Sequence, residues 1–221
     1  MSPMKTEDLI QTLARDAYVQ RLPHPGWRAM VWLAISTAYV AGFVAVMGLR
    51  PDIAAKLAEP RFLVEVGAAY MTSMMAAAAA FCAGCPGRPV WERFAPLPFL
   101  AIWLASLGEG CWRDWLHSGS EGLTLRLDLI CFPMIVVISI VPTVLIFIMV
   151  RRAAPIAPVT TTALATLAAA ALAAAGLRLF HPQDASVMVL VWQFGSVAIL
   201  AGMGALFGRS LLQWPRPLSK A

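Results

Sequence analysis

Residues 129–150 read LICFPMIVVISIVPTVLIFIMV and contain no charged side chain. A helix rises about 1.5 Å per residue, so a run of this length crosses the roughly 30 Å of hydrocarbon in a bilayer. The chain holds six apolar stretches that we expect to span a membrane: Trp27 to Gly48, Phe62 to Phe81, Pro96 to Leu107, Leu127 to Val150, Pro158 to Leu179 and Ser186 to Phe207.

The overall composition supports the same class of protein. Of the 221 residues, 60% are hydrophobic and 13% are charged, whereas about a quarter of the residues of a soluble domain are charged. So few charges cannot cover a water-facing surface of this size. The sequence therefore predicts an all-α integral membrane protein with six transmembrane helices.

The distribution of Lys and Arg predicts the orientation of these helices. Cytoplasmic loops are richer in positive charge. Of the 17 Lys and Arg residues, 11 fall on the side of both termini, and the other side holds Arg50, Lys56, Arg61, Arg113, Arg126 and Arg178. We therefore expect an N-in, C-in membrane protein, with a cytoplasmic segment at 1–26, a transmembrane domain at 27–208 and a cytoplasmic tail at 209–221.

The N-terminal segment has the pattern of a short amphipathic helix. Thr6 is a suitable N-cap, and acidic side chains follow in the first turn, where the helix dipole favours them. An apolar stripe at helical spacing can lie on lipid headgroups or cytoplasmic loops, or it can fill a groove of a cytoplasmic partner. The acidic residues favour the partner, because helices on membrane surfaces are usually rich in Lys and Arg. The candidate partner-binding residues are Glu7, Asp8, Leu9, Ile10 and Leu13.

The four cysteines form two groups. Cys82 and Cys85 make a Cys-x-x-Cys motif on the expected cytoplasmic side, where no second pair or nearby histidine completes a zinc site, so a structural role is favoured. Cys111 and Cys131 are expected near the outer face, Cys111 in a loop that also carries Trp112, Trp115 and His117. In that oxidising compartment they can pair, act as a redox switch, or serve as small packing residues.

Charges inside the spans are scarce. Glu65 is the clear case, and either an ion pair with Arg61, four residues earlier, or snorkelling to the nearby membrane edge is expected to satisfy it. The sequence shows no polar relay through the membrane, no catalytic motif and no cofactor or metal fingerprint, so an enzyme is not expected. The net charge of +5 sits at membrane edges and does not indicate direct nucleic-acid binding. A small transporter and a membrane thiol-redox protein remain as alternatives.

Several short motifs, in order along the chain, resemble one family. They are MKTEDLI at 4–10, PGRP at 86–89, a proline-containing span opened by Cys131 and followed by RRAAP at 151–155, FHPQDAS at 180–186 and GALFGR at 204–209. Together they are similar to the NrsF-type membrane anti-sigma factors.

The resemblance implies a function, a partner and a sensor. Members hold an extracytoplasmic-function sigma factor at the bacterial inner membrane, chiefly through the N-terminal segment, and release it under oxidative or metal stress, so the resemblance implies the same location for this chain. No small-molecule substrate is expected. Many members carry a second outer cysteine just before the sixth span, where this chain has Phe180, His181 and Pro182. Either Cys111 takes its place beside Cys131 as the sensor, or this chain senses another signal.

Overall fold

The computed structural model describes residues 6–7, 10–11, 23–119, 131–151, 157–182 and 186–212, and within these ranges the chain is helical and contains no strand. Six helices in this part of the chain are long and apolar enough to cross a membrane. The expected number of spans is confirmed. The helices are α2 (Pro25–Met47), α4 (Pro60–Ala83), η1 (Val90–Phe94) with α5 (Leu97–Ser118), α6 (Cys131–Arg151), α7 (Pro158–Phe180), and η3 (Val189–Phe194) with α9 (Gly195–Leu211); the short elements are α3 (Ile53–Leu57) and α8 (Ser186–Met188).

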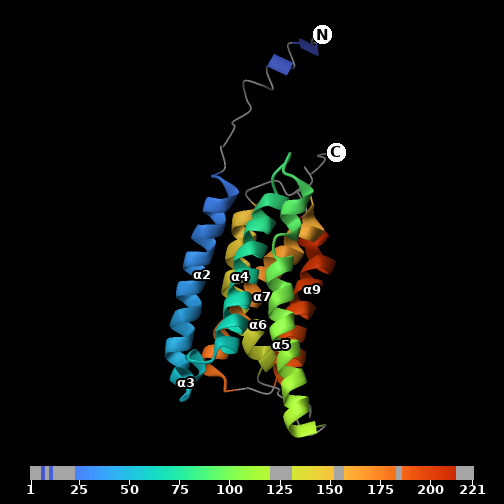
Figure 1. The fold of residues 1–221 in the computed structure, drawn as a ribbon. Coiled ribbons are helices and arrows are strands. Elements are labelled where there is room, and N and C mark those ends of the chain that lie inside the picture. Colours follow the sequence, from blue (N-terminus) through green and yellow to red (C-terminus); the bar gives the residue numbers. More distant parts are fainter. Residues whose placement is uncertain are drawn as a thin grey trace.

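The six long helices stand side by side and alternate in direction (Figure 1). The beginning of α2 and the end of α9 therefore lie at the same end of the bundle, which we call the tail end. The opposite end carries α3 between α2 and α4, and we call it the α3 end. An even number of spans brings the first and last helices back to one side, as an N-in, C-in protein requires.

Prolines mark several helix beginnings. Pro25, Pro60, Pro98 and Pro158 stand in the first two positions of α2, α4, α5 and α7. A proline is tolerated there because the first N–H groups of a helix have no partner within that helix. In the third span, Pro98 lies in the first turn of α5.

The third span is longer than expected. The apolar run ends at Leu107, but α5 continues to Ser118. Glu109 and Arg113 lie four residues apart on this extension. Their ion pair, 2.5 Å from the Arg113 Nη2 to the Glu109 Oε1, supports another turn of helix. Cys111 and its neighbouring aromatic residues therefore lie on a helix, and the predicted loop was wrong. Hydropathy detects the part of a helix that lipid covers, and it misses the polar turns beyond.

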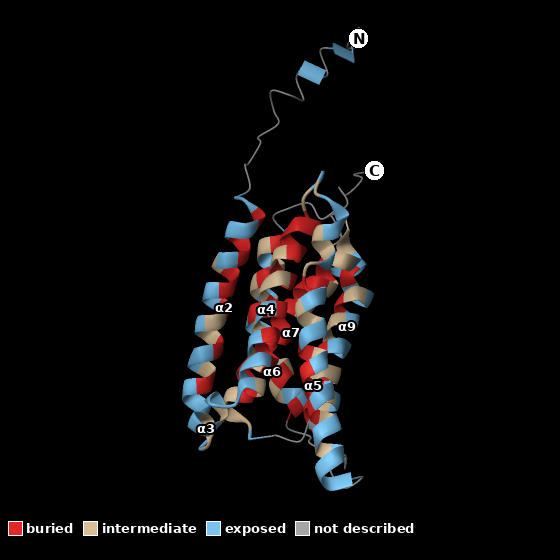
Figure 2. Cartoon of the chain, viewed as in Figure 1, coloured by how far each residue is buried: buried red, intermediate tan, exposed pale blue. Residues whose placement is uncertain are grey.

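The helix α7 forms the centre of the bundle (Figure 2). All of its residues from Ala168 to Ala175 are buried, and it packs against α2, α4, α6 and α9. Small side chains let neighbouring backbones approach closely in a membrane, where packing drives helix association. The alanine run on α4, from Ala76 to Ala80, is also mostly buried. Both alanine runs therefore serve close helix packing.

Two glycines set the contact between α9 and α7. A Cβ built on Gly204 would lie 2.9 Å from the carbonyl oxygen of Thr162, and one on Gly208 would lie 2.9 Å from the Cα of Val159. Real Cβ atoms almost never come this near to backbone atoms. The spacing of the two glycines, four residues apart, places them on one face of α9, and that face lies directly on α7.

Candidate functional site

The expected partner-binding segment is described at a few positions. Glu7 and Ile10 are helical and exposed, and Ile10 has 60% of its surface accessible. Asp8, Leu9 and Leu13 lie outside the described residues. An exposed isoleucine on a helix is available to a partner, while the amphipathic helix as a whole stays a prediction.

Charge differs between the two ends of the bundle. Among the described residues of the bundle, from residue 23 onward, the tail end has five arginines and one acid, Glu92, whereas the α3 end has five basic and five acidic side chains. The tail-end arginines are Arg28, Arg88, Arg93, Arg151 and Arg209; the charged residues of the α3 end are Arg50, Lys56, Arg61, Arg113, Arg178, Asp52, Glu59, Glu65, Glu109 and Asp114. The excess of positive charge at the tail end is what the orientation rule associates with the cytoplasm.

Arg28 joins three helices at the tail end, which the sequence did not reveal. It lies in the first turn of α2 and is 6% exposed. Its guanidinium donates to the carbonyl of Met149 on α6 and lies 4.6 Å from the ring centre of Phe81 on α4. One turn later, the Trp32 indole Nε1 donates to the Pro142 carbonyl over 2.9 Å. The helix that follows the N-terminal segment is thus held firmly in the bundle.

The Cys-x-x-Cys motif forms part of a turn at the end of α4. Cys82 is buried, and the Cys85 thiol donates to the Phe81 carbonyl over 3.4 Å. Gly87 then adopts a φ of +78°, which favours glycine, and Arg88 donates to both carboxylate oxygens of Glu92 over 2.8 Å. In the described part of the chain, no group of three or more His, Cys, Asp or Glu side chains could hold a metal ion.

A buried ion network lies at the α3 end. Glu65, 3% exposed, is 2.9 Å from Arg61 of its own helix, so the expected pair is confirmed. Its other carboxylate oxygen is 2.9 Å from Arg178 on α7, and the Arg178 guanidinium lies 5.3 Å from the ring centre of Phe62. One carboxylate thus joins two guanidinium groups, and it connects α4 to α7.

Arg50 anchors the connection between α2 and α3. The Arg50 backbone N–H donates to the Leu179 carbonyl near the end of α7 over 3.1 Å. Its buried side chain binds both carboxylate oxygens of Asp52, at 2.6 and 2.7 Å. The hydrogen bond from Arg50 holds the pKa of Asp52 below its ordinary value. The pair therefore stays charged at neutral pH, and its stabilisation is lost only as the pH falls through the lowered pKa.

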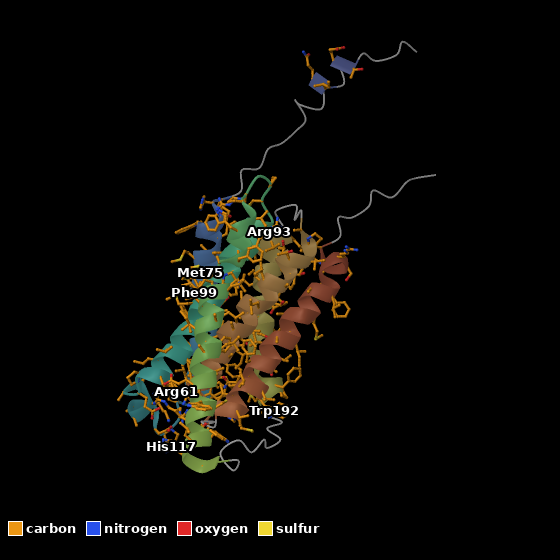
Figure 3. All side chains as sticks on the ribbon, turned by 45° about the vertical axis from the view of Figure 1, so that its right-hand side comes forward. Arg61, Met75, Arg93, Phe99, His117 and Trp192 are labelled. Carbon is orange, nitrogen blue, oxygen red and sulfur yellow. The ribbon has the colours of Figure 1, made fainter. Side chains whose placement is uncertain are left out.

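Both candidate sensor cysteines also lie at the α3 end. Cys131, the first residue of α6, is 2% exposed and belongs to the hydrophobic core. Cys111 is half-buried on α5. Figure 3 shows Arg61 and His117 together at this end, opposite Arg93. All four cysteines of the chain are free thiols.

The sequence was compared with known families and proteins. The NrsF family, described as negative regulator of sigma F, matches residues 13–214. This chain belongs to the NrsF family. The matched range includes all six long helices, and the family name describes a regulator rather than a catalyst. The matched range begins after Glu7, Asp8, Leu9 and Ile10, so the family match does not cover most of the expected partner-binding residues.

A curated relative in the NrsF family agrees with this assignment. The protein named "Probable anti-sigma-F factor NrsF" from Azospira oryzae (strain ATCC BAA-33 / DSM 13638 / PS) is 27% identical over 224 residues, which cover 96% of this chain and all of the relative. No solved structure matches the chain.

Proposed function

We propose that this protein is a multi-pass anti-sigma factor of the bacterial inner membrane. It holds an extracytoplasmic-function sigma factor through its N-terminal segment and releases that factor under oxidative or metal stress. The observation that carries the proposal is the match to the NrsF family across residues 13–214. The six membrane-length helices support the location, because the regulator of a soluble factor can hold it at a membrane only if it is itself anchored there.

The proposed topology keeps the tail end in the cytoplasm. Residues 1–26 then form a cytoplasmic segment, 27–208 the transmembrane domain and 209–221 a cytoplasmic tail. The arginine excess at the tail end supports this orientation. It would place the N-terminal segment on the side where a sigma factor and RNA polymerase are found.

The N-terminal segment supplies the chemistry of a partner-binding helix. Leu9, Ile10 and Leu13 recur at helical spacing and would fill an apolar groove of the sigma factor. Glu7 and Asp8 would face basic side chains beside that groove, which favours the correct partner and speeds its association. Binding by this segment would block surfaces that the sigma factor needs for the polymerase.

Co-purification tests this proposal. The detergent-solubilised full chain and a form lacking residues 1–22 are isolated from the native host, and the bound proteins are identified. The deletion stops short of Pro25, where α2 begins, so the bundle should fold in both. We expect a sigma factor with the full chain and none with the shortened form. If neither preparation contains one, the proposal fails, and a transporter or a thiol-redox protein becomes the better interpretation.

Two full-length variants test whether the apolar stripe itself binds the sigma factor, because neither variant changes the length of the N-terminal segment. Leu9→Ala with Ile10→Ala removes two apolar contacts, and because central apolar anchors each contribute about 2 kcal/mol or more to an interface, sigma-factor recovery should fall at least tenfold. Gln11→Ala is the matched control, since Gln11 is helical and exposed, and its position in the sequence is off the apolar stripe. Equal recovery with both variants would contradict this assignment.

The cysteines at the α3 end are the proposed sensor. Oxidation of Cys111 and Cys131 to a disulfide would pass two electrons and two protons to the oxidant. Cys131→Ser is therefore expected to alter induction of a sigma-dependent reporter by oxidants or metals. Cys111→Ser should do the same if the two thiols pair, and Cys85→Ser, at the other end, should not. A wild-type dose response from Cys131→Ser would exclude this sensor.

A further inference from the structure

A groove opens between α6 and α9 on the outside of the bundle. Its volume is about 380 Å³, and it is lined almost entirely by apolar side chains. Both helices pack on α7 but touch one another little, so α7 forms the floor through Thr166 and the other two form the walls. The wall residues include Ile140, Val144 and Phe147 on α6 and Met203, Phe207 and Leu211 on α9.

The dimensions of the groove suit one lipid chain. On α6 the lining runs from Val136 to Phe147, and at about 1.5 Å per residue this corresponds to about 16 Å along the bilayer normal. Val144 and Ile140 are both about half exposed, as expected for side chains that face lipid. The groove thus lies within the hydrocarbon layer and runs towards the tail end.

A positive charge stands at the mouth of the groove. Arg151 follows Phe147 by four residues, so it lies on the same face of α6. The exposed guanidinium donates to the carbonyl of Leu211, itself a lining residue, over 2.8 Å. Among the described residues of the bundle, from residue 23 onward, the tail end has one acid, Glu92, which binds Arg88. The groove therefore combines an apolar channel with a guanidinium at headgroup depth.

We propose that this groove binds an anionic phospholipid, with one acyl chain between α6 and α9 and the phosphate on Arg151. The apolar walls match the chain, and the guanidinium provides charge-assisted hydrogen bonds that suit a phosphate. A zwitterionic lipid would present a quaternary ammonium together with its phosphate and would gain less from Arg151. The proposal does not depend on the identity of the sigma factor.

Native mass spectrometry tests the site. The detergent-solubilised full chain is mixed with equal amounts of dioleoyl phosphatidylglycerol and dioleoyl phosphatidylcholine, which differ only in the headgroup. A single Arg near a membrane surface favours anionic lipid by about 1 kcal/mol, so we expect about a fivefold preference for phosphatidylglycerol. Arg151→Gln should abolish the preference but keep lipid binding, whereas Val144→Trp should fill the groove and reduce retention of both lipids.

Arg209→Gln is the matched control. It removes the same charge from the last turn of α9, but Arg209 is two residues from Phe207 and so points about 200° away from the groove wall. The preference should survive this change. Equal retention of the two lipids by the wild-type protein, or equal losses in Arg151→Gln and Arg209→Gln, would overturn the proposal.

A second copy of the chain is the competing occupant. A dimer that disappears in Val144→Trp, with lipid retention unchanged, would show that the groove is an interface between two copies and would overturn the lipid site. If Val144→Trp fails to fold, Arg151→Gln still tests the lipid site. The Arg151 side chain is exposed, so replacing it does not disturb the core.

Discussion

Replacing Glu65 with alanine is expected to lower the free energy of unfolding by about 3–5 kcal/mol, the cost of breaking a buried ion pair by removing one partner. The change takes the carboxylate away from Arg178, whose side chain is 8% exposed, and from Arg61. Two guanidinium groups then stand close together without the negative charge between them. The measurement is unfolding of the purified protein in mixed micelles with increasing sodium dodecyl sulfate.

Glu59→Ala is the control for that experiment. Glu59 pairs with Lys56 at 3.0 Å, but 53% of its side chain is exposed, so its loss should cost less than about 1 kcal/mol. The double variant Glu65→Gln with Arg178→Gln should be less destabilised than the two single variants combined, because the pair is then removed together. Wild-type stability of Glu65→Ala would show that the network contributes nothing to folding.

Gly208→Leu is expected to separate α9 from α7 and to destabilise the protein by about 3 kcal/mol, the upper part of the usual range for overpacked cores. A Cβ at this position would meet the backbone of Val159 at 2.9 Å and the carbonyl oxygen of Pro158 at 3.0 Å. Because backbone atoms cannot rotate away as a side chain can, the whole helix must move. Unfolding in sodium dodecyl sulfate measures the loss.

Gly202→Leu is the matched control, because it adds the same side chain to the same helix. Gly202 is exposed, and a Cβ there meets no atom within 4 Å. Its stability should remain within about 0.5 kcal/mol of the wild type, as for other surface changes. Equal stability of the two variants would mean that the contact between α7 and α9 is not as close as the structure has it.

The membrane-spanning helices were predictable because their signal is local. An uncharged run such as 129–150 is long enough to cross lipid wherever it occurs in a fold. The end of α5 was not predictable in this way. Beyond Leu107 the helix leaves the apolar run, and polar side chains such as Glu109 and Arg113 occur in helices and in loops alike.

The candidate sites, too, could be predicted from the sequence only in part. The sequence placed Cys111 and Cys131 near one end, and the structure has both at the α3 end. The proposed partner-binding residues rest on the helical spacing of their side chains and on family resemblance. Nothing in the sequence singled out Arg28, because an arginine at the start of an apolar run usually marks the membrane edge, yet it is buried against Phe81 and Met149.

The Glu65 network shows where the information in the sequence ends. The sequence by itself determined the helices, their alternating directions and the contact between Arg61 and Glu65, because residues four apart on a helix are neighbours. Only the tertiary structure brought in Arg178, which is 113 residues away from Glu65 along the chain. The physical reason is that spacing fixes contacts within one helix, whereas packing of small residues on α7 decides which helices meet.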